Sequence, residues 1–371
     1  MKKIHIKSLS VILVAILIIK MFSTVCYASP KKLRVDAGSA IAVDSLSGRV
    51  LFEQNSRSLV PVASTTKIVT ALVALSYGDL EEEFTISKNS AAIRGSTVGY
   101  KAGEKITLYE LLYGLMFKSG NDAAIAIAEG IGGSVEGFCN IMNEYCIQIG
   151  MLDSHFESPH GLDSQNHYST AYDLAIATKK AKENPIFHEI VSSKSIDKSK
   201  HGFTRDYQNI NKLLYQMPNA NGVKTGYTGG AGKCLVSSVK MKEGDIIIVT
   251  LNCTPRWEET RKIFNYVDET YDYKKVISKG EVLKTIEVEN GDGKLNLISR
   301  KDVILPVKED EKLNIEVDVP QNLKAPINKE EKIGTVRVSD ENGKIVYEYM
   351  LSQNEIEKKP IYKIIKEKLL N

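Results

Sequence analysis

The sequence has few of the features that mark several common classes of protein. It contains a single tryptophan, and its 49 basic and 46 acidic residues nearly balance. Residues 1–28 hold four lysines and no acid, so 45 basic residues face 46 acidic ones in the rest of the chain. Nucleic-acid-binding proteins usually carry a basic stripe. We therefore expect no nucleic-acid partner.

The sequence is also short of long polar or apolar stretches. With 43% hydrophobic and 26% charged residues, it is neither a disordered polar chain nor an all-membrane protein. Its 371 residues suffice for one large domain with a smaller one, or for two medium domains, each with its own core.

Metal-binding spacings do not occur in the sequence. Neither Cys-x-x-Cys nor His-Glu-x-x-His is found. His155, His160 and His167 lie near one another but follow no ligand pattern. We interpret these histidines as structural and expect no zinc site.

Two of the cysteines fall in a predicted β-hairpin. Residues 234–241 and 246–253 have the pattern of two strands around a turn. Pairing Met241 with Ile246 would place Cys234 opposite Cys253. We expect these two to be neighbouring buried thiols, and a disulfide between them stays open as the alternative.

The N-terminus is typical of a secretory signal peptide. Residues 1–7 are basic, residues 11–19 form an unbroken apolar run, and Cys26-Tyr27-Ala28 presents small residues for a cut after Ala28. One alternative is a permanent membrane anchor, although a spanning helix needs roughly 20 apolar residues. The other is a lipoprotein cut before Cys26, for which the preceding residues are a poor lead-in. We expect residues 1–28 to direct export and to be removed.

The apolar spacing up to about residue 275 indicates an α/β fold. Two short apolar runs around Ser45-Leu46-Ser47-Gly48 predict a hairpin. Helical periodicity is found over Thr65–Tyr77, Leu108–Phe117, Asp122–Gly130, Gly137–Ile149 and Thr170–Lys182, and a late helix is expected within Trp257–Tyr273. Strands at both ends of residues 29–275 with helices between them predict an α/β sandwich whose sheet joins the first and last strands.

The character of the sequence changes after residue 275. Short alternating segments separated by turn residues indicate a small all-β domain over 276–353. The segments are Val282–Val288, Asp302–Val307, Leu313–Val319, Lys332–Val338 and Lys344–Leu351. Residues 354–371 are predicted to form an amphipathic helix with several lysines outside its apolar face, which could lie on an anionic membrane. The alternative is a helix packed on the body of the protein.

Three short strings carry the candidate chemistry. They are Ser64-Thr65-Thr66-Lys67 at the start of a buried helix, Ser119-Gly120-Asn121 between two buried helices, and Lys224-Thr225-Gly226 before a predicted strand. Spacing of three puts Ser64 and Lys67 on one helix face. Ser-x-x-Lys occurs elsewhere in the chain, but only here does it open a buried helix. The simpler alternative is that Ser64 is an N-cap, that Ser119 and Asn121 are loop polars, and that Lys224 lies on the surface.

Together these residues have what acyl transfer through a serine requires. Lys67 can take the proton of Ser64 if burial and a nearby cation such as Lys224 lower its pKa. Ser119 can relay a proton to the leaving amine, and Asn121 can orient Lys67 and hold a substrate amide.

The third string is suited to binding the end of a peptide. Lys224 and Thr225 would bind a terminal carboxylate, and Gly226 lets the substrate approach the strand. The backbone N–H groups of Ser64 and Tyr227 are the natural donors to an oxyanion.

The three strings resemble those of the penicillin-recognising serine enzymes. The surrounding residues are similar to those of the low-molecular-weight D-Ala-D-Ala carboxypeptidases of the peptidase S11 type. These residues are Val62-Ala63-Ser64-Thr65-Thr66-Lys67, Ser119-Gly120-Asn121-Asp122-Ala123, Tyr168-Ser169-Thr170-Ala171 and Lys224-Thr225-Gly226-Tyr227-Thr228. The likeness covers about residues 35–271, and residue 227 is Tyr where relatives often have Phe or His.

The resemblance implies helices packed on an antiparallel sheet, as in β-lactamases and transpeptidases. It implies removal of the last D-alanine from peptidoglycan stem peptides through an acyl-serine, with no metal or other cofactor, and covalent acylation by β-lactams. The all-β segment and the tail look like that family's C-terminal domain and membrane anchor. The expected location is the outer face of the bacterial cytoplasmic membrane.

Three other functions stay open on the sequence alone. A β-lactamase shares the three strings, but it would carry a second carboxylate in a Glu-x-x-Leu-Asn string, which does not occur within residues 29–275. A transpeptidase or endopeptidase differs only in the acceptor. A non-catalytic wall-binding module would keep the strings without acylation.

Overall fold

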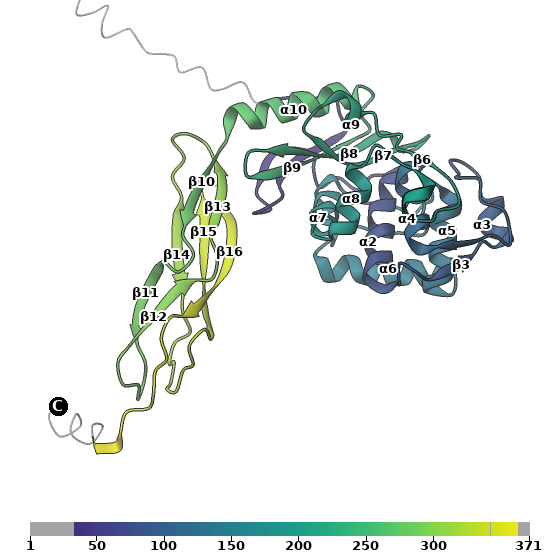
Figure 1. Cartoon of the computed structure of the whole chain (residues 1–371). Coiled ribbons are helices and arrows are strands. Elements are labelled where there is room, and N and C mark those ends of the chain that lie inside the picture. Colours follow the sequence, from purple (N-terminus) through teal and green to yellow (C-terminus); the bar gives the residue numbers. More distant parts are fainter. Residues whose placement is uncertain (1–32, 342, 363–371) are drawn as a thin grey trace, which may run out of the picture. The chain divides into compact units, whose positions relative to one another are not determined.

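The computed structural model describes residues 33–341 and 343–362 (Figure 1). The expected signal peptide at residues 1–28 lies outside the described residues, as do residues 363–371 of the expected tail. Among the described residues, none of the helices combines the length and the apolar character that crossing a membrane requires.

An antiparallel sheet of five strands forms the centre of residues 35–271, in the order β2-β1-β9-β8-β7. The strands are β1 (Ser39–Asp44), β2 (Val50–Gln54), β7 (Ala220–Thr228), β8 (Gly232–Met241) and β9 (Gly244–Leu251). The hairpin between β1 and β2 turns at the expected residues, where Gly48 has a φ of 76° that favours glycine. Strand β1 pairs with β9, so the expected union of the first and last strands is confirmed.

The helices predicted from apolar spacing are all present and start within two residues of the expected positions, and the late helix ends three residues before the expected Tyr273. They are η1 (Ala63–Thr66) with α2 (Lys67–Tyr77), α4 (Leu108–Phe117), α5 (Asn121–Gly132), α6 (Val135–Ile149), α7 (Ala171–Lys182) and α10 (Arg256–Thr270). The side chains of Thr107, Ser134 and Thr170 cap α4, α6 and α7 by accepting hydrogen bonds from N–H groups of their first turns.

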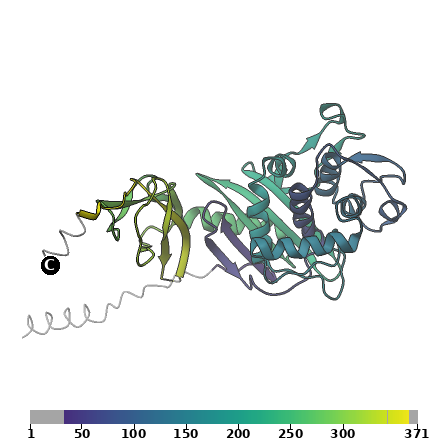
Figure 2. The same ribbon diagram turned by 90° about the horizontal axis from the view of Figure 1, so that it is seen from below.

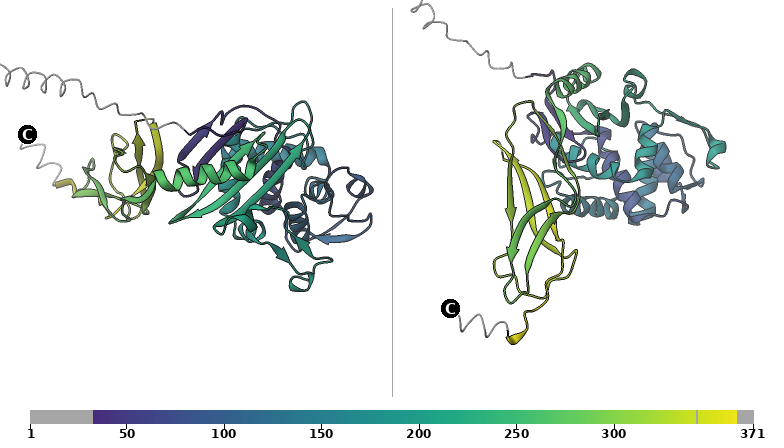
Figure 3. Two further views of the ribbon diagram at one scale, coloured as in Figure 1. Left: turned by 90° about the horizontal axis from the view of Figure 1, so that it is seen from above. Right: turned by 60° about the vertical axis from the view of Figure 1, so that its left-hand side comes forward.

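The sheet lies between two layers of helices. Seen from above, α10 crosses in front of the sheet (Figure 3), and seen from below, the layer that includes α2 and α7 is in front (Figure 2). Strand β8 separates the two cores because its side chains alternate between faces. Val236 packs in the large core of the helical layer, whereas Val239 packs near Trp257 of α10.

Several short elements were not predicted, because segments of two to eight residues show too little periodicity to be recognised. They are α3 (Lys88–Ala92), α8 (Pro185–Ser192), α9 (Leu213–Gln216), η2 (Lys198–Lys200), and the strand pairs β3 (Glu83–Thr85) with β4 (Lys105–Thr107) and β5 (Ser195–Ile196) with β6 (Tyr207–Gln208).

The predicted register of the β8–β9 hairpin is wrong by two residues. Met241 pairs with Gly244 rather than Ile246, around a tight turn in which Lys242 has a φ of 46°. Tight turns of this kind suit the twist of a hairpin better than the longer turn expected. Cys253 still lies beside β8, since its N–H donates to Lys233 O at 2.8 Å. Both Cys234 and Cys253 are free and buried.

Residues 272–352 form β-structure with a separate apolar core. A two-stranded sheet pairs β10 (Asp272–Ile277) with β13 (Val303–Val307), and a five-stranded sheet has the order β11-β12-β16-β15-β14. The strands of the larger sheet are β11 (Val282–Glu287), β12 (Lys294–Ser299), β14 (Asn314–Asp318), β15 (Lys332–Asp340) and β16 (Gly343–Ser352). Strands β10 and β12 were not predicted, and the boundary expected after residue 275 falls within β10.

The tail helix does not begin at residue 354 as expected. Ile356 bridges to Ile327, and Lys358 bridges to Gly291. Ile356 is buried in the core of the β-structure, so burial of this apolar side chain holds the segment extended. Residues 361–362 are helical.

Candidate active site

Ser64 lies in a strained turn at the head of α2. Ala63 has a φ of 50°, a left-handed conformation that costs about 1–3 kcal/mol for a residue other than glycine. Two hydroxyl groups hold this turn, with Thr65 Oγ1 donating to Val62 O at 2.6 Å and Thr66 Oγ1 donating to Ala63 O at 2.8 Å. The N-cap positions of η1 and α2 belong to Val62 and Thr66. Ser64 is therefore not a helix cap.

Lys67 is completely buried one helical turn from Ser64. Its Nζ lies 3.0 Å from Ser64 Oγ, 2.8 Å from Asn121 Oδ1 and 2.8 Å from His160 O. Burial lowers the pKa of Lys67 well below its ordinary value, and the charge of Lys224 lowers it further. Both causes are those expected from the sequence. A neutral amine beside a serine hydroxyl can act as a base.

The amide of Asn121 has one possible orientation. Its Nδ2 donates to Arg94 O at 2.6 Å, and its backbone N–H donates to Ser96 O at 2.7 Å. Because a carbonyl oxygen can only accept, the amide nitrogen must face Arg94 and the amide oxygen must face Lys67. The loop that carries Arg94 and Ser96 therefore fixes a hydrogen-bond partner of Lys67.

Ser119 and Lys224 form a second buried pair. Lys224 Nζ donates to Ser119 Oγ at 2.9 Å and to Thr225 O at 2.8 Å. Ser119 has a φ of 58°, a second strained residue at the site. Lys224 is 1% exposed, so it is not a surface lysine. Burial lowers its pKa to about 7, and the charge of Arg256 contributes in the same direction.

Strand β7 approaches the serine turn at Gly226. A β-carbon at this position would lie 3.1 Å from Ser64 N and 3.2 Å from Ala63 Cβ, which is tighter than ordinary contact. Glycine therefore lets the strand and the turn approach one another. Since β7 is an edge strand of its sheet, it can pair with an extended peptide. The next residue, Tyr227, has 67% of its surface exposed.

The residues predicted from the three strings are thus brought together. Ser64, Lys67 and Asn121 form one hydrogen-bonded group, and Ser119 and Lys224 form another. Thr225 takes part through its backbone oxygen, Gly226 through close contact with the serine turn, and Tyr227 lies at the exposed end of the string.

Sequence reasoning missed three groups at this site. The carbonyl oxygens of His160 and Arg94 have no sequence signature, because every residue carries one. Arg256 Nη1 donates to Gly226 O at 2.7 Å and to Cys234 O at 2.9 Å, which ties β7 to β8. No motif in the sequence distinguishes this arginine from the others.

The histidines that were interpreted as structural include two buried ones. Burial lowers the pKa of His160 to about 3 and that of His167 to about 4. His167 Nδ1 accepts from Glu157 N at 3.1 Å and its Nε2 lies 2.9 Å from Thr66 Oγ1, so the ring braces the serine turn. Within the described part of the chain, no cluster of three metal-ligating side chains occurs.

Three features together are typical of the penicillin-recognising serine enzymes. They are an antiparallel sheet covered by helices, a Ser–Lys pair at the head of a buried helix, and a second lysine on the edge strand. The chain belongs to the peptidase S11 family of D-alanyl-D-alanine carboxypeptidases, whose family model matches residues 26–254. A second model, the C-terminal domain of penicillin-binding protein 5, matches residues 271–358. The resemblance predicted from the sequence is confirmed, and so is the predicted fold class apart from the tail helix.

Individual relatives agree with the family assignment. The D-alanyl-D-alanine carboxypeptidase DacF of Bacillus subtilis is 31% identical over 354 residues, which cover 88% of this chain and 87% of the relative. Penicillin-binding protein 5 of Haemophilus influenzae is 26% identical, with a TM-score of 0.76 over 89% of this chain and all of that one. The K15 DD-transpeptidase of Streptomyces, solved as a point mutant, is 32% identical, with a TM-score of 0.59 over 63% of this chain and 98% of that one.

Proposed function

We propose that the protein is a serine-type D-Ala-D-Ala carboxypeptidase. It removes the terminal D-alanine from peptidoglycan stem peptides through an acyl-Ser64 intermediate, and penicillins acylate the same serine. The observation that supports this most directly is the hydrogen-bond environment of Lys67 Nζ, which lies within 3.0 Å of Ser64 Oγ and 2.8 Å of two oxygens that only accept.

The environment of Lys67 suits it to be the base of the acylation step. A neutral amine has two N–H groups and one lone pair. Asn121 Oδ1 and His160 O take the two N–H groups, because neither oxygen can donate. The lone pair then points to Ser64, whose proton moves to Lys67 as Ser64 Oγ attacks the carbonyl carbon of the penultimate residue.

The negative oxygen formed in this attack needs donors. The backbone N–H groups of Ser64 and Tyr227 supply them, and the close approach of β7 to the serine turn at Gly226 supports this role. Ser119 relays to the amine of the leaving D-alanine the proton that Lys67 took from Ser64, as the C–N bond breaks, so that Lys67 is neutral again. Water then hydrolyses the acyl-serine and frees the shortened peptide.

The terminal carboxylate of the substrate binds to Lys224 and the Thr225 hydroxyl. Lys224 is buried, and the charge of Arg256 also acts on it. A carboxylate offsets the mutual repulsion of these two cations, which favours ligands that end in a free acid. Arg256 Nε is buried without a hydrogen-bond partner within the described residues, which leaves a further donor near this charge.

The Lys224→Ala variant is expected to lose selectivity for a free carboxylate. The kcat/KM for release of D-alanine should fall about tenfold or more further than the kcat/KM for a peptide with an amidated terminus. Because burial lowers the pKa of Lys224 to about 7, half of its charge is lost at that pH, and the preference in the wild type should decline as the pH rises through 7.

The decisive quantity is the ratio of the kcat/KM losses for the acid and for the amide. Loss of Lys224 also changes the pKa of Lys67, and that change affects both ligands. Lys240→Ala, at an exposed position of β8, is the matched control and should keep the wild-type ratio. Equal losses for the acid and the amide would contradict the carboxylate role.

A DD-transpeptidase is the second candidate, because the Streptomyces K15 enzyme is 32% identical to this chain. Incubation with a pentapeptide ending in D-Ala-D-Ala, with and without an amine acceptor, separates the two reactions. We expect free D-alanine and tetrapeptide in equal amounts even when the acceptor is present. A tetrapeptide–acceptor adduct as the main product, or no free D-alanine at all, would count against the carboxypeptidase.

We also propose that the protein acts outside the cytoplasm. Residues 1–28 direct export and are cleaved, and the catalytic domain is followed by an all-β domain that begins near residue 272. The amphipathic tail holds the protein on the outer face of the membrane. Its apolar residues and lysines are suited to an anionic lipid surface.

Removal of residues 361–371 tests the membrane role of the tail. The cut leaves Ile356, which is buried in the β-structure, and so spares the domain core. After cell fractionation the truncated protein should leave the membrane fraction while its penicillin labelling stays at the wild-type rate. A truncated protein that remains with the membranes would show that the anchor lies elsewhere.

A further inference from the structure

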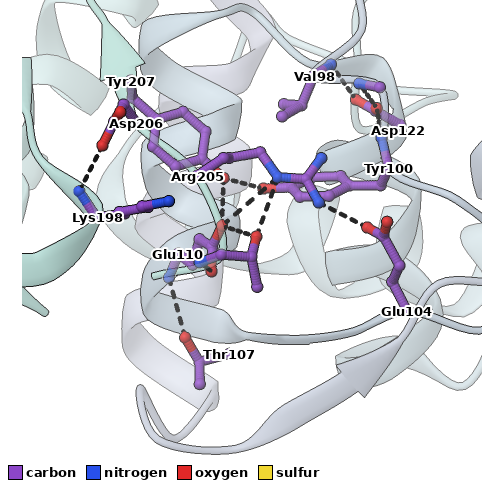
Figure 4. A network of polar contacts seen from close by, with 12 residues as sticks. Val98, Tyr100, Glu104, Thr107, Glu110, Asp122, Lys198, Arg205, Asp206 and Tyr207 are labelled. Carbon is purple, nitrogen blue, oxygen red and sulfur yellow. Dashed lines mark hydrogen bonds and ion pairs between the residues drawn. The ribbon is translucent and has the colours of Figure 1, made fainter. Parts of the chain in front are cut away.

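A buried carboxylate outside the reacting groups connects three segments near the site (Figure 4). Glu110, on α4, is 2% exposed. It accepts hydrogen bonds from Thr204 N at 2.8 Å, from Thr204 Oγ1 at 2.6 Å and from Tyr207 OH at 2.6 Å. Arg205 Nε lies 3.9 Å from it. All of these donors belong to the segment from β5 to β6, which is far from α4 in the sequence.

Holding two segments together through a buried charge costs free energy. Removing a carboxylate from water carries a large penalty, and apolar residues of similar size often give equal or greater stability. The charge does supply directional bonds, which fix where each donor lies. The hydrogen bonds around Glu110 therefore serve to fix the positions of the segments that they join rather than to increase the stability of the fold.

The bonds continue from Glu110 to the loop over residues 94–104. Tyr207 OH lies 2.8 Å from Tyr100 OH. Burial raises the pKa of both phenols, so both keep their protons. Because Tyr207 donates to Glu110, Tyr100 must donate to Tyr207. Arg205 adds to this link by lying 4.4 Å over the Tyr100 ring and pairing with Glu104 at 2.7 Å.

The same loop reaches the catalytic group. Asp122 accepts from the backbone N–H groups of the loop at Val98, Gly99 and Tyr100, as Figure 4 shows in part. Arg94 O and Ser96 O accept from Asn121, which orients the amide oxygen toward Lys67. Hydrogen bonds therefore run from Glu110 through Tyr207 to Tyr100 of the loop, the loop backbone leads to Arg94 and Ser96, and hydrogen bonds lead from there to Asn121 and Lys67.

We propose that Glu110 is a positioning residue for acylation of Ser64. Through Tyr207 and Tyr100 it holds the loop over residues 94–104 in the place where the Arg94 and Ser96 carbonyls orient Asn121. Asn121 in turn keeps the lone pair of Lys67 directed at the serine. This inference rests on the proposed function, since it concerns the rate of the same acylation step.

The rate of acylation by a fluorescent penicillin, measured over a range of concentrations, tests the inference. Tyr207→Phe removes the hydroxyl that joins Glu110 to Tyr100 and keeps the ring. We expect its limiting acylation rate to fall about tenfold, with the half-saturating concentration within about twofold of the wild type, because Lys224 and Thr225 lie on β7. Glu110→Gln should be slowed at least as much, since its amide nitrogen would face a donor.

Tyr113→Phe is the matched control. Tyr113 is a buried tyrosine, as Tyr207 is, and it lies on α4 with Glu110. Its hydroxyl donates to Glu189 at 3.3 Å, away from the loop over residues 94–104. Its acylation rate should stay within about twofold of the wild type. The fraction of protein labelled at long times should be complete in all variants, because a positioning defect slows a folded enzyme, whereas a structural defect reduces the amount of it.

Three results would overturn the inference: a wild-type rate in Tyr207→Phe, a reduced labelled fraction with an unchanged rate, or an equal slowing in Tyr113→Phe. If Glu110→Gln does not fold, Tyr207→Phe still decides. A wild-type protein that takes no label would overturn the proposed function as well, so the two failures are distinguishable.

Discussion

Replacement of Ser64 by alanine is expected to abolish covalent labelling by a fluorescent penicillin, a loss of at least about 1,000-fold in the acylation rate. In the proposed mechanism the serine oxygen forms the bond to the penicillin and Lys67 takes the serine proton, and the two groups lie 3.0 Å apart. Alanine removes the nucleophile without changing the strained turn, whose hydrogen bonds come from Thr65 and Thr66. The measurement is fluorescence of the labelled band at fixed protein concentration.

Ser195→Ala is the matched control for Ser64→Ala. It alters another Ser-x-x-Lys string, Ser195 to Lys198, in which the serine is exposed. This variant should label at the wild-type rate. Labelling that survives in Ser64→Ala would mean that another residue is the nucleophile, and no labelling of the wild type would favour a non-catalytic wall-binding module.

Replacement of Lys67 by alanine is expected to slow acylation by about 100-fold to 10,000-fold, the contribution typical of a general base. Among the described residues Lys67 is the hydrogen-bond partner of Ser64 Oγ, and the other partners of Lys67 are an amide oxygen and a backbone carbonyl, neither of which is a base. The variant should stay folded. Burial lowers the pKa of Lys67 in the folded state. At a pH below the ordinary pKa of lysine, the unfolded chain therefore binds this proton more strongly, and Lys67 lowers the free energy of unfolding.

Lys67→Arg separates the loss of a base from the loss of a charge. Arginine keeps a positive charge but does not give up its proton in proteins, so this variant should be as slow as Lys67→Ala. A thermal unfolding curve for each variant checks the fold. Near-normal acylation by either folded variant would show that another group activates Ser64.

Much of the fold could be predicted from the spacing of apolar residues in the sequence. The helices around the site are long and strongly apolar, so their spacing alone located them. The β8–β9 register could not be found in this way, because alternation is unchanged by a shift of two residues and only the turn decides. Strand β10 lacks the alternation of a half-buried strand, since most of its residues are exposed or half-buried.

The site was predictable where side chains carry the chemistry and was not where the backbone does. Ser64, Lys67 and Lys224 stand in recognisable strings, but the carbonyl oxygens of His160 and Arg94 are contributed by loops whose path only the fold determines. Glu110 gave no signal because an acidic residue in an apolar helix has many explanations. Its importance is visible only once Tyr207 and Tyr100 are seen beside it.

The most direct test of the whole account is to locate the bond that it requires. The full exported chain is mixed with a D-Ala-D-Ala-terminated peptide or a slowly hydrolysed penicillin, quenched in acid, digested and examined by mass spectrometry. The account predicts one acyl group per chain, attached to the peptide that contains Ser64, with release of one D-alanine for each acyl group formed from the peptide substrate. An acyl group on any other residue, or D-alanine release from a chain whose Ser64 never becomes acylated, would contradict it.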